Sequence, residues 1–247
     1  MKKKLYLIVL FSTFLLSLSA QQRLVPKKGI AENKWIHNQS FDMDWTMLRD
    51  TLSIPLGRVS VKVEVSADQV IVITEVDLNK SMSAWIDSTI VKRSDLSPVY
   101  HSSYNEQRNM VLHFQDRIHG FYLDKQTGKM TQIEQDVNPG YFDSNFYPTL
   151  INWLPLKAGF KSELNIYDYN PMGESGILKV HIRSVKEGIY ESRKLGRRKV
   201  WVVEVADEIG RKTETTSIYQ IDQLTRQLFK QTISSSGRLM NMTLVEN

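Results

Sequence analysis

Residues Phe142 to Phe160 read FDSNFYPTLINWLPLKAGF and form the most apolar stretch beyond the first 20 residues. We expect a short helix over residues 144–154. Its N-terminus can be capped by Asp143, Ser144 or Asn145, whose side chains accept hydrogen bonds from free backbone N–H groups. The rest of the chain is interpreted around this helix.

Two prolines bound the predicted helix. Pro148 fits its first turn, and Pro155 ends it after about two turns. Most of its surface is apolar, so the helix needs apolar cover on more than one side. Two interpretations follow: an ordinary buried connecting helix, or a lid over an apolar cavity inside a curved sheet.

The N-terminus has the layout of a secretory signal peptide over residues 1–20. Lys2 to Lys4 precede an apolar run from Leu5 to Leu18, and the small residues Ser19 and Ala20 follow it. The run is shorter than the roughly 20 residues that a bilayer span needs, although an uncleaved anchor is the alternative. The chain has no cysteine, which excludes disulfides and an acylated lipoprotein N-terminus. We therefore expect a periplasmic protein that is soluble and not a lipoprotein.

The net charge and the distribution of basic residues do not indicate a nucleic-acid partner. The formal charge of +5 includes the three leader lysines, which leaves about +2 for the remaining chain. The dense basic run Arg193 to Lys199, RKLGRRK, could face phosphate or anionic lipid, but it precedes a strand and suits a solvated loop. No nucleic-acid motif accompanies it.

The pattern along the chain is that of β structure. Val59, Val61, Val63 and Val65 alternate with polar residues, and Val70 to Val76 forms a second strand after a turn. Further short strands follow at spacings of about 8 to 12 residues, which is typical of a sandwich or barrel. No linker divides residues 55–247, so we expect one domain there, preceded by an N-terminal arm over residues 21–54.

One turn pattern occurs twice. Phe121 to Thr127 and Tyr219 to Thr225 each carry an aromatic strand end followed by Asp-x-x-Thr. Aspartate and threonine side chains can bind nearby backbone N–H groups, which predicts two similar turns.

No catalytic or metal motif stands out. The five histidines form no metal signature, and no phosphate-binding glycine loop or nucleophile elbow occurs. His113 and His119 could meet across a hairpin, and His101 lies beside Ser102. An enzyme would become credible if the fold brought a histidine within reach of a serine or aspartate in a cleft. We expect no enzyme, no cofactor and no metal.

Three motifs resemble one protein family. They are Trp85 to Thr89 followed by Asp95 to Val99, the run Leu154 to Gly159 (LPLKAG), and Val200 to Glu204 with Tyr219 to Arg226. Together they resemble a bacterial periplasmic family of unknown function with a lipoprotein-carrier-like (LolA/LppX-like) β half-barrel. The likeness covers roughly residues 55–245. The chain departs from it at Tyr219, often tryptophan there, and in its long arm.

The resemblance implies a mainly β fold. We expect a single antiparallel, strongly curved sheet, an unclosed half-barrel of about ten or eleven strands, with a short central helix covering the concave face. Some relatives of this architecture carry acyl chains or lipoproteins, although a shared fold does not fix function.

Two functions follow as expectations. The first is a non-enzymatic periplasmic binding protein that holds a lipid, an acyl chain or an acylated protein in its half-barrel, with peripheral contact to the membrane. Its apolar cavity would be lined by seven residues: Trp85, Phe114, Phe146, Ile151, Trp153, Trp201 and Phe229. The alternative is an envelope interaction or assembly module with a filled core, docked on another envelope protein through a strand edge.

Overall fold

The computed structural model describes residues 22–79, 81–171, 173, 175–207, 209 and 214–246, so the predicted signal peptide lies outside the described residues. Two short helices occur there, η1 (a 3₁₀ helix, Asn33–Trp35) and α1 (Tyr147–Trp153). The strands in chain order are β1 (Gln22–Leu24), β2 (Gln39–Arg49), β3 (Leu52–Val65), β4 (Gln69–Leu78), β5 (Trp85–Lys92), β6 (Pro98–Tyr104), β7 (Arg108–Phe114), β8 (Ile118–Asp124), β9 (Met130–Gln135), β10 (Phe142–Asp143), β11 (Ser162–Asp168), β12 (Gly176–Ser192), β13 (Gly196–Asp207), β14 (Thr215–Asp222), β15 (Leu228–Ser235) and β16 (Arg238–Leu244). No helix in this part of the chain is long and apolar enough to cross a membrane.

All the strands belong to one curved sheet. Its order is β1-β11-β12-β13-β14-β15-β16-β2-β3-β4-β5-β6-β7-β8-β9, with β10 paired to β11 beside this path. The end strands β1 and β9 do not pair with each other, so the sheet does not close. Neighbours are antiparallel except that β1 and β10 run parallel to β11. The predicted single curved, unclosed sheet is confirmed, but its strand count is 16, not ten or eleven.

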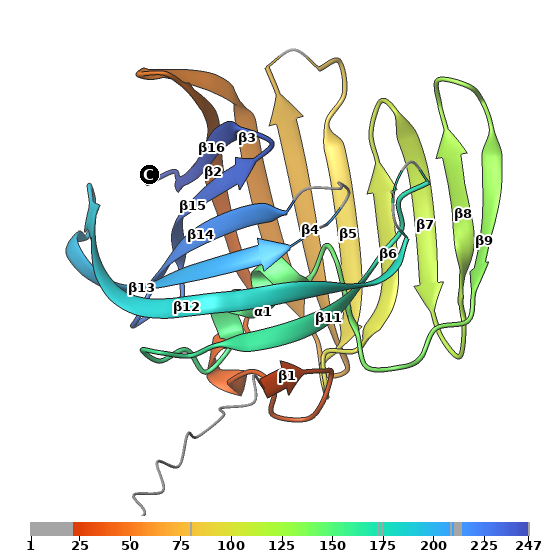
Figure 1. Ribbon diagram of the computed structural model, residues 1–247, viewed down its shortest axis with the longest axis horizontal. Helices are drawn as coiled ribbons and strands as arrows, with labels where there is room; N and C mark the ends of the chain where they lie inside the picture. The colour runs from red at the N-terminus through yellow and green to blue at the C-terminus, as the bar shows by residue number, and fades with distance from the viewer. Residues whose placement is uncertain are drawn as a thin grey trace, which may run out of the picture.

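The sheet folds over so that its two halves cover each other. Figure 1 shows β11 to β14 running across β4 to β7, with α1 between the two layers. One hydrophobic cluster joins them, since it includes Val72 of β4, Leu150 of α1 and Val203 of β13. The main core therefore lies inside the fold of the sheet.

Helix α1 fills that interior. Pro148 lies in its first turn and the helix ends at Trp153, two residues before Pro155, as predicted. Leu150 and Ile151 are wholly buried, and Trp153 is 1% exposed. The predicted caps were wrong, because Phe146 is the N-cap residue and makes no side-chain cap hydrogen bond. The polar residues at 143–145 are engaged elsewhere, in the site described below.

The predicted N-terminal arm contributes a full strand. Strand β2 lies between β16 and β3, and the expected boundary at residue 54 falls inside β3. Asp42 and Asp44 lie within this strand, although aspartate is depleted in strands. Each carboxylate has a partner on β3: the Ser60 hydroxyl donates to Asp42 at 2.7 Å and Arg58 to Asp44 at 3.1 Å.

The predicted hairpin and the two predicted Asp-x-x-Thr turns are confirmed. Strands β3 and β4 form the predicted hairpin, with Val65 opposite Val70. In both Asp-x-x-Thr turns the carboxylate of the aspartate, Asp124 or Asp222, accepts hydrogen bonds from two backbone N–H groups of the turn. The basic run at 193–199 spans the turn between β12 and β13 and the start of β13, where Arg198 pairs with Asp222.

Candidate functional site

The seven residues predicted to line one apolar cavity lie in several places. Phe146, Ile151 and Trp153 are packed in the main core, where Trp85 and Trp201 lie partly buried at its margin. Phe114 belongs to a second, smaller cluster. Phe229 stacks on Tyr190 with ring centroids 4.8 Å apart. The fold therefore does not gather these residues around a shared space.

A hollow of about 800 Å³ opens instead beside a group of polar side chains. Strands β5, β6 and β7 form one wall, and the segment from β10 to α1 and the end of β11 form the other. We call it the polar cleft, and the lining residues that matter here are Trp85, Asp87, His101, Arg108, Asn145 and Asp168.

Strand register explains why polar groups meet here. Asp87 lies opposite Ser103 and Thr89 opposite His101 across β5 and β6. Side chains two residues apart on a strand share a face, so all four point to the same side. That side faces the short β10–α1 connection, because β11 holds β10 in place by parallel pairing at Tyr167.

Asp143 lies beneath the polar cleft and is fully buried. Its Oδ1 atom lies 2.8 Å from Nδ1 of His101, and its Oδ2 atom accepts a hydrogen bond from the Thr89 hydroxyl at 2.8 Å. Asn145 donates to the same hydroxyl at 3.1 Å. Both oxygens of a buried carboxylate are thus satisfied, as burial of a charge requires.

His101 is 5% exposed and its charged form is favoured by its neighbours. Burial of the ring disfavours the charge, but Asp143, by charge and hydrogen bond, and the charges of Asp87 and Asp168 together raise the pKa of His101 above its ordinary value. Among the described residues only Nδ1 of this ring has a hydrogen-bond partner, so Nε2 is the atom that can meet a ligand.

Asp168 closes the opposite wall. The Ser144 hydroxyl donates to its Oδ1 atom at 2.7 Å. Burial raises the pKa of the Asp168 carboxyl, and the charge of Asp143 adds to this, against the opposing effects of Ser144, His101 and Arg108. The main physical cause is that burial removes water from around the charged carboxylate.

Trp85 and Arg108 form the mouth. The Trp85 indole N–H contacts Asp87 Oδ1 at 2.7 Å and the Ser103 hydroxyl at 3.2 Å. Arg108 donates to the same hydroxyl at 3.1 Å and lies over the Trp85 ring at 5.7 Å. This contact combines a cation–π interaction with a hydrogen bond and holds the guanidinium at the rim.

The polar cleft contains part of a catalytic arrangement. A buried histidine bound to an aspartate is the base and orienting partner of a nucleophilic triad. The nearby hydroxyls are used otherwise: Thr89 binds Asp143 and Ser144 binds Asp168. Among the described residues no hydroxyl bonds to Nε2 of His101, and no group of three metal-ligating side chains forms.

Sequence reasoning missed most of this site. His101 is a catalytic candidate by its sequence context, and the structure brings it to an aspartate, but the sequence predicts that aspartate, Asp143, as a helix cap. The signal available was a polar run directly before an apolar helix. The pairing of Asp143 with a strand 42 residues away has no local sequence signature. The two other histidines of interest, His113 and His119, do meet across β7 and β8, with stacked rings 5.0 Å apart.

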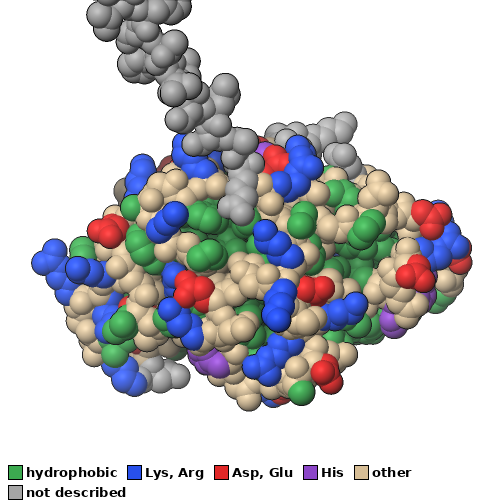
Figure 2. Space-filling model, turned by 90° about the horizontal axis from the view of Figure 1, so that it is seen from below, with side chains coloured by type: hydrophobic (Ala, Val, Ile, Leu, Met, Phe, Trp, Pro, Cys, Tyr) green, Lys and Arg blue, Asp and Glu red, His purple; other side chains and the backbone are tan. Residues whose placement is uncertain are grey.

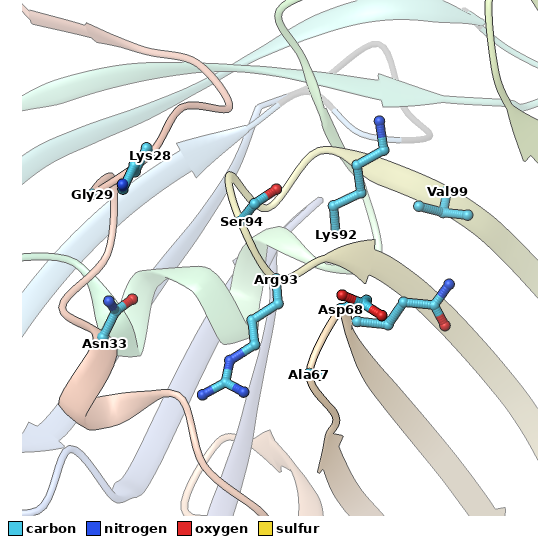
Figure 3. A pocket seen from close by; sticks show the side chains of 10 residues that line it. Lys28, Gly29, Asn33, Ala67, Asp68, Lys92, Arg93, Ser94 and Val99 are labelled. Atoms are coloured by element: carbon cyan, nitrogen blue, oxygen red, sulfur yellow. The ribbon is translucent and has the colours of Figure 1, made fainter.

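A second hollow of about 760 Å³ lies at the other end of β5. Figure 3 shows Arg93 and Ser94, after β5, across from Lys28 and Asn33. Its cations Lys28, Lys92 and Arg93 are exposed, and Arg93 binds the backbone oxygen of Ser66 at 2.8 Å. Figure 2 shows lysine and arginine side chains spread widely over the lower face. The three cations of this second hollow are therefore solvated surface groups.

Comparison with known proteins places the fold and the family. No curated protein matches the chain. The crystal structure of a β-barrel-like protein of the domain of unknown function DUF1849, from Brucella abortus, is similar with a TM-score of 0.52 and 10% identity, over 85% of this chain and 97% of that chain. Such low identity shows the fold alone. A family model described as protein of unknown function (DUF3108) matches residues 40–244, which includes β2. The chain therefore belongs to the DUF3108 family of proteins of unknown function.

Proposed function

We propose that this chain is a non-enzymatic binding protein whose recognition site is the polar cleft. The observation that carries the proposal is the buried His101–Asp143 pair, whose free ring atom Nε2 opens on a hollow of about 800 Å³. Concave sites with a few convergent polar groups and perturbed pKa values are where small ligands bind.

A binding role fits the groups better than a catalytic one. Activation of a nucleophile needs a hydroxyl or thiol in contact with the base. The Thr89 and Ser144 hydroxyls have carboxylate partners, and the Ser103 hydroxyl is held by Trp85 and Arg108. The polar cleft thus offers fixed donors and acceptors without an assembled nucleophile. In this proposal His101 binds the ligand and does not act as a catalytic base.

The lipid-holding version of the function has less support. It requires space on the concave face, where α1 lies with Leu150 and Ile151 fully buried. A lipid tail in that position would have to displace the helix. The alternative of an interaction or assembly module agrees with the filled core. A location in the periplasm, expected from the leader sequence, remains part of the proposal.

Native mass spectrometry of the protein purified from its own cells tests the choice. We expect a small polar molecule bound at one per chain. Gln107→Trp should remove it, because Gln107 is exposed and lines the polar cleft, so tryptophan there blocks the space without removing a buried group. Gln115→Trp is the matched control, since Gln115 is equally exposed in the turn after β7, at the other end of that strand.

Each other outcome decides against the polar cleft. A bound mass that survives Gln107→Trp places the ligand elsewhere. A bound lipid supports the lipid-holding function, and a stoichiometric protein partner without a small molecule supports the assembly module. A wild-type protein that carries no bound mass would contradict the proposal.

A further inference from the structure

We infer that the ligand of the polar cleft carries a cationic group, an organic ammonium that lies between Asp87, Asp168 and His101. The inference rests on the proposed function and specifies the chemistry that the site recognises. It depends on the charges, the open acceptor atoms and the size of the hollow.

The described charges of the polar cleft do not balance. Three carboxylates, Asp87, Asp143 and Asp168, face two possible cations, Arg108 and His101. Three negative charges and one permanent positive charge give −2 with His101 neutral and −1 with it charged. Burial strengthens such an imbalance because the site is poorly screened by water. A cation would therefore be attracted and an anion repelled.

The open atoms are acceptors. The Trp85 indole occupies Oδ1 of Asp87, and the Ser144 hydroxyl occupies Oδ1 of Asp168. The second oxygen of each carboxylate has no hydrogen-bond partner among the described residues, and neither is a buried atom left without a partner. We infer that both oxygens can accept from a ligand in the polar cleft, which Asp87 and Asp168 line. A carboxylate oxygen can only accept, which selects a ligand that donates.

His101 is the independent observation that points to a ligand. Its side chain is 7% exposed and its Nδ1 atom is fixed by Asp143. Above the raised pKa of His101 the ring is neutral, carries its proton on Nδ1 and presents Nε2 as an acceptor. Together with the free oxygens of Asp87 and Asp168 this makes three acceptors, which matches the three N–H donors of a primary ammonium.

The size of the hollow argues for an organic cation. About 800 Å³ is far more than an ammonium group alone requires, and small-molecule sites fall in this range. Met110 and Tyr169 line the same space and offer apolar contact to the body of the ligand. No three metal-ligating side chains of the described residues come together, so a bare metal ion lacks a ligand set.

A ligand cation would compete with protons. The titratable groups that line the space are Asp87 from β5, His101 from β6, Arg108 from β7, Asp168 from β11 and Tyr169 directly after β11. Asp143 from β10 lies buried behind His101. Protonation of His101 or Asp168 removes an acceptor and adds positive charge. Because the pKa of both groups is raised, binding should strengthen as the pH rises from about 5 to about 8.

Three probes of similar size test the charge: butylammonium, butanol and butyrate. Binding is measured by NMR, from the shift of the Trp85 indole N–H, which lies at the mouth beside Asp87. We expect butylammonium to bind and the two others not to. Asp168→Asn should weaken binding by about tenfold to a hundredfold, the scale of one charged hydrogen bond. Asp87→Asn is the second variant, and Asp116→Asn, in an exposed turn, is the control.

The outcomes separate the inference from the proposed function. If butyrate or butanol shifts the Trp85 signal and Gln107→Trp abolishes the shift, the polar cleft binds ligands and the cationic chemistry is wrong. If none of the three probes binds the wild type, the cationic ligand is also overturned, while the bound mass from native cells decides the proposed function separately. If butylammonium binds equally to wild type and to both aspartate variants, Asp87 and Asp168 are not its acceptors, which also contradicts the inference.

Discussion

The imidazole of His101 and the carboxylate of Asp143 lie 2.8 Å apart, Nδ1 to Oδ1, in a protein whose main hydrophobic cluster packs around α1. The pair joins strand β6 to the short strand β10, and β10 leads directly into α1. It therefore connects the polar cleft to the helix that fills the fold. A buried charged pair of this kind stabilises only while both partners are present.

Removal of one partner should be costly. Asp143→Ala leaves the His101 ring and the Thr89 hydroxyl without their shared acceptor, and we expect a loss of about 3 to 5 kcal/mol in the free energy of unfolding. Urea unfolding followed by tryptophan fluorescence measures it. Asp136→Ala is the control, because the Asp136 side chain is 84% exposed and should have little effect. A similar small loss for both variants would show that the pair contributes nothing.

Stability should depend on pH through His101. Its pKa is raised in the folded state, against about 6.5 when unfolded, so the folded protein binds the proton more tightly. The contribution is complete below about pH 6.5 and is lost as the pH rises through the folded pKa. We expect the free energy of unfolding to fall over that window, and His101→Gln to remove the slope. A slope that persists in His101→Gln must come from another group.

Much of the fold could be predicted from the sequence, because it depends on local periodicity. Val59 to Val65 and Val70 to Val76 alternate or cluster as strands do, and the Asp124 and Asp222 turns follow from side-chain chemistry within four residues. Strand β2 lies within the predicted N-terminal arm; Asp42 and Asp44 interrupt its apolar pattern, and partners on β3 satisfy them in space.

The site could not be predicted for the same physical reason. The residues that form it come from five strands and one connection, and each contact depends on the register of distant pairs. Thr89 and Asn145, for example, are 56 residues apart and meet at 3.1 Å. An apolar helix predicted to cover a cavity also cannot be told from one that fills the space, since both require the same apolar surface.

Truncation inside α1 tests whether the fold is filled. Ile151→Ala should lower the free energy of unfolding by about 2 to 5 kcal/mol, because Ile151 is fully buried and the surrounding layers cannot collapse fully onto the space. Ile189→Ala, at a strand position that is 46% exposed, is the matched control and should cost much less. Equal small losses would indicate that α1 borders an open cavity and would favour the lipid-holding function.

The two Asp-x-x-Thr turns should differ in stability although their sequences are alike. Asp222 is fully buried and receives Arg198 Nε at 2.7 Å in addition to the backbone N–H groups of Leu224 and Thr225. Asp124 makes the same turn contacts but is only half-buried, and no cation among the described residues pairs with it. We expect Asp222→Ala to lower the free energy of unfolding by about 2 to 3 kcal/mol, and Asp124→Ala to have a smaller effect.

The contribution of Asp222 to the free energy of unfolding should depend on pH. This dependence tests whether the charge of the carboxylate matters, which truncation alone does not show. Burial opposes the charged carboxylate, but hydrogen bonds from Arg198 and from the Thr225 and Leu224 backbone outweigh it and lower the pKa of Asp222. Its contribution is present above the unfolded pKa of about 3.9 and is lost as the pH falls through the folded value. The difference in stability between wild type and Asp222→Ala should therefore shrink at acidic pH, measured by urea unfolding from about pH 6 down to about pH 3. A difference that stays constant across that range would show that the Arg198 contact does not depend on the charge of Asp222.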